Sequence, residues 1–101
     1  MKKVIQIPIE WKNISELFVA LGDEQRQRIL LAFDKGERMN ILQIVENSNL
    51  SRTAVAHHLK VLQQGGALKR EKIGKEVFYW VDKEAITIAI ENVYNYIKKE
   101  I

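Results

Sequence analysis

The chain has 101 residues, a mass of 11.8 kDa and a formal net charge of +3 at pH 7. This length fits one domain, and 47% hydrophobic with 29% charged residues lies in the ordinary range of soluble folded proteins. The absence of cysteine excludes disulfides, thiolate metal ligands and cysteine-based redox sensing. No segment has the length of a membrane span or a signal-peptide core, so we expect a cytoplasmic protein that does not bind a membrane.

The N-terminal segment predicts an arm followed by a helix. Residues 1–9 form an extended arm in this interpretation, because the residue before Pro8 is biased away from helix, and residues 10–101 form the folded domain. Apolar residues then recur at three- and four-residue steps and predict a first helix that Gly22 ends. These residues are Trp11, Ile14, Leu17, Phe18 and Leu21.

Two more helices are predicted before residue 50. Asp23 is a good N-cap for the second, in which Ile29, Leu30 and Phe33 supply the buried side until a basic last turn and Gly36 end it. Asn40 caps a short third helix over residues 41–45, and the polar cluster at residues 47–49 breaks it.

Residues 51–64 predict an amphipathic fourth helix. Ser51 is its N-cap, and Val55, Leu59 and Leu62 recur at helical spacing on the buried side. The other face mixes long basic groups, hydrogen-bonding groups and one small residue, which suits base edges in the major groove of DNA. By itself, such a face is more often plain solvated surface. The predicted DNA contacts on this helix are Ser51, Arg52, Thr53, Ala56, His57, Lys60 and Gln63.

A basic β-hairpin over residues 67–81 strengthens the DNA interpretation. Gly74-Lys75 suits a two-residue type II′ turn, and the second strand, VFYWV, is apolar enough to be covered on both sides. Residues 50–75 hold six basic residues and one acidic residue, a net charge of +5, so the rest of the chain carries −2. Charge this localised is typical of a surface that binds a polyanion. The hairpin residues predicted to contact the phosphate backbone of DNA are Lys69, Arg70, Lys72 and Lys75.

The last helix predicts a homodimer. It begins after Asp82, runs to about Lys99, and carries apolar residues over more of its circumference than one small core needs. The alternative is that the first and last helices both close over the core of one monomer. The predicted dimer contacts are Trp11, Ile14, Phe18, Ile86, Ile90, Val93 and Ile97.

The elements together predict a mainly α fold, a winged helix-turn-helix with about five helices and a two-stranded wing. Two segments, LFVALGDEQRQRIL from Leu17 and SRTAVAHHLKVLQQGGAL from Ser51, make the chain resemble the ArsR family of small winged-helix repressors. The resemblance implies that Asp23 and Arg26 are architectural, that helix 51–64 enters the major groove and that wing 69–75 follows the phosphate backbone. It also implies that the terminal helices pair two protomers.

The chain departs from the metal-sensing members of the family it resembles. Those members place paired cysteines near the third helix, where this chain reads ILQIV, or Asp and His ligands on the last helix, where Asp82 is followed by Lys83 and Glu84. Neither ligand set is present, so we expect no metal and no cofactor. Either the effector is an unknown non-metal compound, or no small effector exists.

Other chemistries fit the sequence less well. His57 and His58 point about 100° apart on a helix and do not chelate one ion, and His58 falls nearer the apolar side, where one hydrogen bond to backbone or a carboxylate would satisfy it. Ser51 and His58 lie about 10 Å apart along the helix, too far for proton transfer, and no phosphate-binding glycine loop exists, so we predict no enzyme. The aromatic residues fit packing better than base stacking, although they could line an effector pocket.

The sequence therefore predicts a homodimeric, sequence-specific, double-stranded DNA-binding regulator of transcription, with repression favoured over activation. The alternative is a winged-helix module that binds an acidic protein partner through the basic wing.

Overall fold

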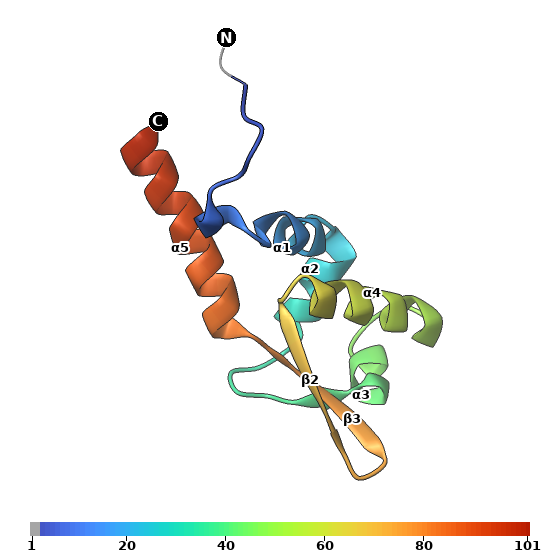
Figure 1. Cartoon of the computed structure of the whole chain (residues 1–101). Coiled ribbons are helices and arrows are strands. Elements are labelled where there is room, and N and C mark those ends of the chain that lie inside the picture. The colour runs from blue at the N-terminus through green and yellow to red at the C-terminus, as the bar shows by residue number, and fades with distance from the viewer. Residues whose placement is uncertain (1–2) are drawn as a thin grey trace.

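The computed structural model describes residues 3–101, so Met1 and Lys2 of the predicted arm lie outside the described residues. Residues 3–8 contain neither helix nor strand, and Figure 1 shows this segment projecting away from the helical body. A single 3-10 turn, η1 (Ile9–Trp11), follows Pro8, whose ring fixes its φ near −53°.

Helix α1 (Ile14–Leu21) is shorter than predicted, because Asn13 adopts a left-handed conformation with φ of 71° directly before it. The prediction of one continuous helix starting at Trp11 is therefore wrong. Trp11 belongs to η1, and its ring meets the Tyr96 ring edge-on with a centroid distance of 5.5 Å. The N-terminal segment is thereby held against the last helix, α5 (Lys83–Glu100).

Helix α2 (Glu24–Leu31) begins where predicted, with the Asp23 carboxylate accepting a hydrogen bond from the Arg26 backbone N–H at 3.0 Å. It ends at Leu31, before Phe33, so the predicted extension to Lys35 is wrong. Gly36, with φ of 73°, lies in the following loop and does not cap the helix. This loop leads into strand β1 (Met39–Asn40).

Helices α3 (Ile41–Glu46) and α4 (Arg52–Gln64) form the predicted helix-turn-helix. Asn40 and Gln43 exchange two hydrogen bonds of 2.9 Å in a capping box that starts α3. The hydroxyl of Ser51 accepts from the Ala54 N–H at 3.2 Å and starts α4 as expected. Both helix starts thus follow from side chains that satisfy otherwise unpaired N–H groups.

The sheet has three strands in the order β1-β3-β2, not the two strands predicted. Strands β2 (Leu68–Ile73) and β3 (Glu76–Val81) form the hairpin, and β1 pairs with β3 through Met39 opposite Tyr79. Gly74 has φ of 64°, as the first central position of a type II′ turn requires. The residues of VFYWV are half-buried rather than covered on both sides, because the hairpin extends beyond the core (Figure 1).

The core lies between α1, α2, α3, α4 and the base of the hairpin. Its most deeply buried large side chains are Ile44, Val55, Leu59 and Leu62. Helix α5 buries no residue completely, although Ile86 and Ala89 pack against the core. Within the described part of the chain, no helix combines the length and the apolar run needed to cross a membrane.

Candidate nucleic-acid interface

The polar face of α4 is exposed because its opposite face anchors the helix in the core. Val55, Leu59 and Leu62 are each at most 1% exposed, which confirms the predicted buried side. Helix α4 packs on α1, α2 and α3, so its orientation is fixed from several directions. All seven side chains predicted to contact DNA from this helix are exposed, namely Ser51, Arg52, Thr53, Ala56, His57, Lys60 and Gln63.

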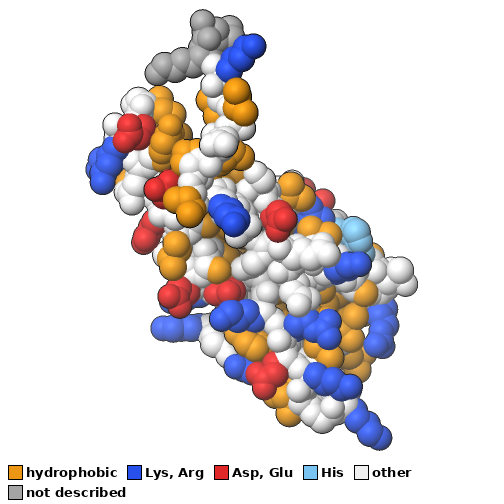
Figure 2. All heavy atoms as spheres, in the orientation of Figure 1, with side chains coloured by type: hydrophobic (Ala, Val, Ile, Leu, Met, Phe, Trp, Pro, Cys, Tyr) orange, Lys and Arg blue, Asp and Glu red, His pale blue; other side chains and the backbone are white. Residues whose placement is uncertain are grey.

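The hairpin carries the other predicted contacts, and these are exposed as well: Lys69, Arg70, Lys72 and Lys75. Only Leu68 of β2 is buried, so this strand extends outward from the core with its basic side chains in solvent. Among the residues that the structure describes, Lys69 is the one of these four within 4 Å of a carboxylate, at 3.8 Å from Asp82. Figure 2 shows Lys and Arg side chains gathered over α4 and the hairpin, down to its tip.

A groove joins α4 to the hairpin. It is lined by Ala56, Lys60, Gln63 and Gln64 of the helix and by Arg70 and Tyr79 of the two strands. The structure thus brings three predicted base contacts and one predicted backbone contact to one concave surface. Tyr79 was not predicted there. Its place in the register, opposite Arg70 on β2, was the signal that would have located it.

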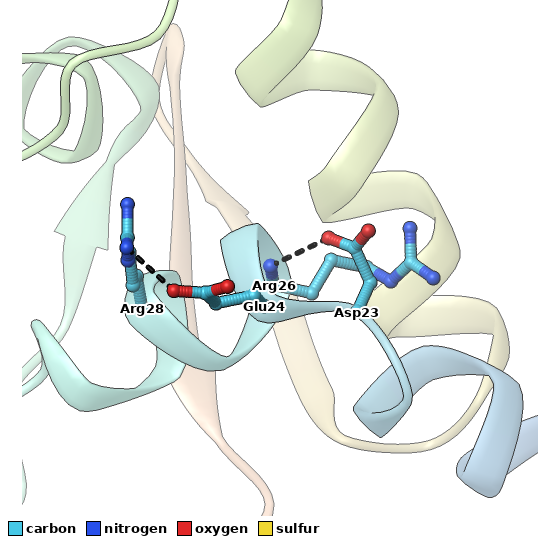
Figure 3. Close-up of polar contacts among 4 residues, drawn as sticks. All are labelled: Asp23, Glu24, Arg26 and Arg28. Atoms are coloured by element: carbon cyan, nitrogen blue, oxygen red, sulfur yellow. Dashed lines mark hydrogen bonds and ion pairs between the residues drawn. The ribbon is translucent and has the colours of Figure 1, made fainter.

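Arg26 connects α2 to the two helices beside it. Its Nε and Nη2 donate to the backbone oxygens of Ala20 and Val19 at the end of α1, both at 2.9 Å. Its Nη1 lies 3.3 Å from Nδ1 of His58 on α4. Figure 3 shows the Arg26 side chain reaching from α2 toward α4, on the opposite side of α2 from the Glu24–Arg28 ion pair.

This contact changes the interpretation of His58. The sequence suggested a hydrogen bond to backbone or a carboxylate, whereas the neighbouring group is a guanidinium. Burial is the main cause that lowers the pKa of His58; Arg26 and His57 lower it further, and Asp23 opposes them. The hydrogen bond from the Arg26 backbone N–H is the main cause that lowers the pKa of Asp23.

The chain ends present an apolar surface. Phe18, Ile90 and Ile97, three of the predicted dimer contacts, are 45%, 49% and 48% exposed. The predicted contacts Trp11, Ile86 and Val93 are half-buried within the chain. Ile14 is only 4% exposed, so its assignment to a dimer surface is not supported, because its side chain is already buried in the monomer. Ile88 and Tyr94 are also exposed on α5, and the predicted set of dimer contacts did not include them.

No three His, Asp or Glu side chains within residues 3–101 lie close enough together to hold a metal ion. The geometry instead shows a helix-turn-helix with an exposed polar second helix, adjoined by a cationic hairpin. These features define a winged helix-turn-helix protein.

Comparisons with known proteins agree with this class. A family model described as "Bacterial regulatory protein, arsR family" matches residues 23–68, from the cap of α2 to the start of β2. The uncharacterized HTH-type transcriptional regulator YbzH of Bacillus subtilis is 32% identical over 85 residues, covering 70% of this chain and 85% of YbzH. The chain therefore belongs to the ArsR family.

Two other proteins extend the similarity beyond the matched segment. The transcriptional repressor SdpR of Bacillus subtilis is 28% identical over 86 residues, covering 85% of this chain and 94% of SdpR. The homodimeric winged helix-turn-helix DNA-binding domain Mb0332 of Mycobacterium bovis, a possible ArsR-family regulator, has a TM-score of 0.68 at 16% identity. The match covers 93% of this chain and 88% of that one. The sequence-based prediction of a transcriptional regulator rather than an enzyme is confirmed.

Proposed function

We propose that this protein is a homodimeric repressor that binds a specific double-stranded DNA site, with α4 in the major groove and residues 69–75 along the phosphate backbone. The observation that carries the proposal is the shared location of the two surfaces. The exposed face of α4 and the basic side chains of the hairpin lie on one side of the molecule, joined by the groove that Lys60 and Arg70 line. Such a surface matches the shape and charge of a DNA groove with its flanking phosphates.

Base readout falls to the N-terminal half of α4 in this proposal. Arg52 and Thr53 lie in its first turn, which enters the major groove first in helix-turn-helix proteins. An arginine can donate two hydrogen bonds to guanine, and Ala56 leaves room for close approach. His57, Lys60 and Gln63 continue the same face toward the groove beside the hairpin.

Affinity comes from the cations of both elements. If each dimer neutralises about six to ten phosphates, binding should weaken by about 10³ to 10⁵ between roughly 50 and 200 mM salt. Lys72 and Lys75 sit nearest the hairpin turn and should contact only phosphates.

Dimerisation through the chain ends would place two α4 helices in successive major grooves, about 34 Å apart. The exposed apolar side chains of α5 and of α1 around Phe18 support this arrangement. The homodimeric state of Mb0332 and the repressor function of SdpR support it as well. Acting on DNA, the protein would work in the compartment that holds the chromosome, which we take to be the cytoplasm.

Two matched variants test the proposal on a duplex found by genome-wide binding and footprinting. Arg52→Ala should weaken the free energy of binding to the specific site by about 1 to 3 kcal/mol and relax the base preference at one position of that site. Lys72→Ala should weaken specific and random duplexes equally and make the salt dependence shallower. Equal losses on both duplexes for Arg52→Ala would remove that residue from base readout. A flat salt response of the wild-type protein would contradict DNA binding by this surface.

A further inference from the structure

The contact between Arg26 and His58 lies where three helices meet. Arg26 belongs to α2, it donates to the backbone oxygens of Val19 and Ala20 in the last turn of α1, and its side chain lies against His58 near the middle of α4. The two residues are 32 positions apart in the chain, so the contact reflects tertiary packing. Residues 57 and 58 are adjacent, yet His57 is exposed and His58 is half-buried, so only the latter faces the junction.

The chemistry of the contact requires a neutral imidazole. A guanidinium has only donors, so Nδ1 of His58 must supply a lone pair and the ring proton must sit on Nε2. A doubly protonated imidazole has no acceptor, and it would place a second positive charge 3.3 Å from the guanidinium. The hydrogen bond would then become a repulsive contact between α2 and α4.

We propose that Arg26 and His58 position the DNA-binding helix, and that protonation of His58 opens this contact and weakens DNA binding as the medium becomes acidic. Arg26 and His58 are positioning residues in this inference, because neither is among the predicted DNA contacts. The inference rests on the proposed function wherever DNA affinity is the measurement.

The charged groups around His58 set the direction of the effect. Arg26 on α2 and His57 on α4 disfavour its protonation, and Asp23 at the start of α2 favours it. Burial is the largest cause and acts in the same direction as Arg26 and His57, so the pKa of His58 lies below its ordinary value of 6.5. The folded state therefore binds a proton less readily than the unfolded state, and stability falls as pH drops below about 6.5 toward the lower folded pKa. Each unit of difference corresponds to about a tenfold change in the folding equilibrium.

His57 requires a control because it is adjacent to His58 and lies on the exposed face proposed to contact DNA. A DNA measurement on the wild-type protein alone would mix the contributions of the two histidines. Unfolding without DNA removes any contribution that His57 makes through contact with the duplex.

The test compares the wild-type protein with His58→Asn and His57→Asn between pH 8 and 5.5. The Oδ1 atom of asparagine sits as many bonds from Cβ as Nδ1 does, so it can accept from Arg26 and stays neutral at every pH. Urea unfolding at fixed protein concentration measures stability, and titration of a fixed duplex measures affinity. For the wild-type protein, the free energy of unfolding and the affinity for the duplex should both fall in acid. In His58→Asn, the part of this fall that comes from protonation of His58 should be absent. His57→Asn should keep most of the acid-dependent loss of stability, because His57 is the smallest of the causes that lower the pKa of His58.

The two measurements test the role of His58 and the proposed DNA binding separately. An equal loss of stability in acid for the wild type and His58→Asn would overturn the inference, as would a loss that only His57→Asn removes. Weaker duplex binding by His58→Asn than by the wild type at pH 8, with unchanged stability, would also overturn it, because the neutral acceptor should rescue positioning. If no variant binds duplex DNA at pH 8 and low salt, the proposed function fails, and the unfolding series still decides the role of His58.

Discussion

Gly65 offers a sharp test of how α4 is fixed against α1. A Cβ atom built at this position would lie 2.7 Å from Cβ of Ala20 and 2.7 Å from the backbone oxygen of Glu16. Gly65 has φ of −77° and ψ of −4°, a conformation open to any residue, so its role is close approach and not backbone freedom. Gly65→Ala must therefore push two helices apart.

The loss of folding stability in Gly65→Ala can be worked out from those distances. Carbon atoms pack at about 3.5 to 4.0 Å, so the added methyl group would overlap Ala20 by about 1 Å. Neither neighbour can rotate away, because one is a backbone atom and Ala20 is fully buried without rotamers of its own. Overpacking of this kind costs about 1 to 3 kcal/mol, which for a domain of this size lowers the melting temperature by at least about 4 °C.

Gly66 provides the matched control, because a Cβ there meets nothing within 4 Å while its φ is 81°. Gly66→Ala should lose about 1 to 2 kcal/mol from backbone strain, and Gly66→Asn should recover part of that loss. Gly65→Asn should recover nothing, since its defect is steric. Urea unfolding at one fixed protomer concentration measures all four variants. A Gly65→Ala protein within about 0.5 kcal/mol of the wild type would refute this account of the α1–α4 contact.

Three further substitutions address the core, the cap and the sheet. Leu59→Ala should cost about 2 to 5 kcal/mol in urea unfolding, because its side chain is 1% exposed in the core. The pKa of Asp23 is lowered by the cap, so its contribution is present above pH 3.8 and is lost as pH falls through the lower folded value. Asp23→Asn should flatten that part of the stability profile. Arg38→Ala removes a guanidinium 3.8 Å from the centre of the Trp80 ring and should cost about 0.5 to 1 kcal/mol, with a shift in tryptophan emission.

Helix α4 shows what a sequence records most directly. Its start at Ser51 and its buried side through Val55, Leu59 and Leu62 were predicted correctly. In a long amphipathic helix, the buried apolar residues recur with a period of 3.6 residues, and this period is visible in the sequence. The hairpin was predicted for a similar reason, since Gly74 marks a turn that only certain residues adopt readily.

The errors arose where tertiary contacts decide the structure. Strand β1 has two residues and exists because Met39 pairs with Tyr79, 40 positions away, which leaves no local pattern. The apolar spacing of Trp11 with Ile14 predicted one helix, but the left-handed Asn13 separates them. Phe33 likewise continues the apolar spacing of α2 after the helix has ended.

The candidate site also has features that the sequence predicts and features that depend on tertiary contacts. Positive charge concentrated between residues 50 and 75 was visible in the sequence, and the structure exposes every one of those side chains. The partner of His58 was not visible, because Arg26 is brought to it only by the packing of α2 on α4. Periodicity could place His58 toward the apolar side but could not name a guanidinium as its neighbour.

The short link between α4 and β2 makes the helix and the hairpin one rigid surface. Ala67 is fully buried, its N–H donates to the Leu62 oxygen at 2.9 Å, and its own oxygen accepts from the Asp82 N–H at 2.9 Å. The exit of α4, the start of β2 and the end of β3 are therefore fixed to one another by a single residue. Because the backbone positions that carry the cations of both elements keep a set spacing, a polyanion gains from all of them together only if its charges match that spacing, and regularly spaced duplex phosphates meet this condition better than a flexible acidic chain.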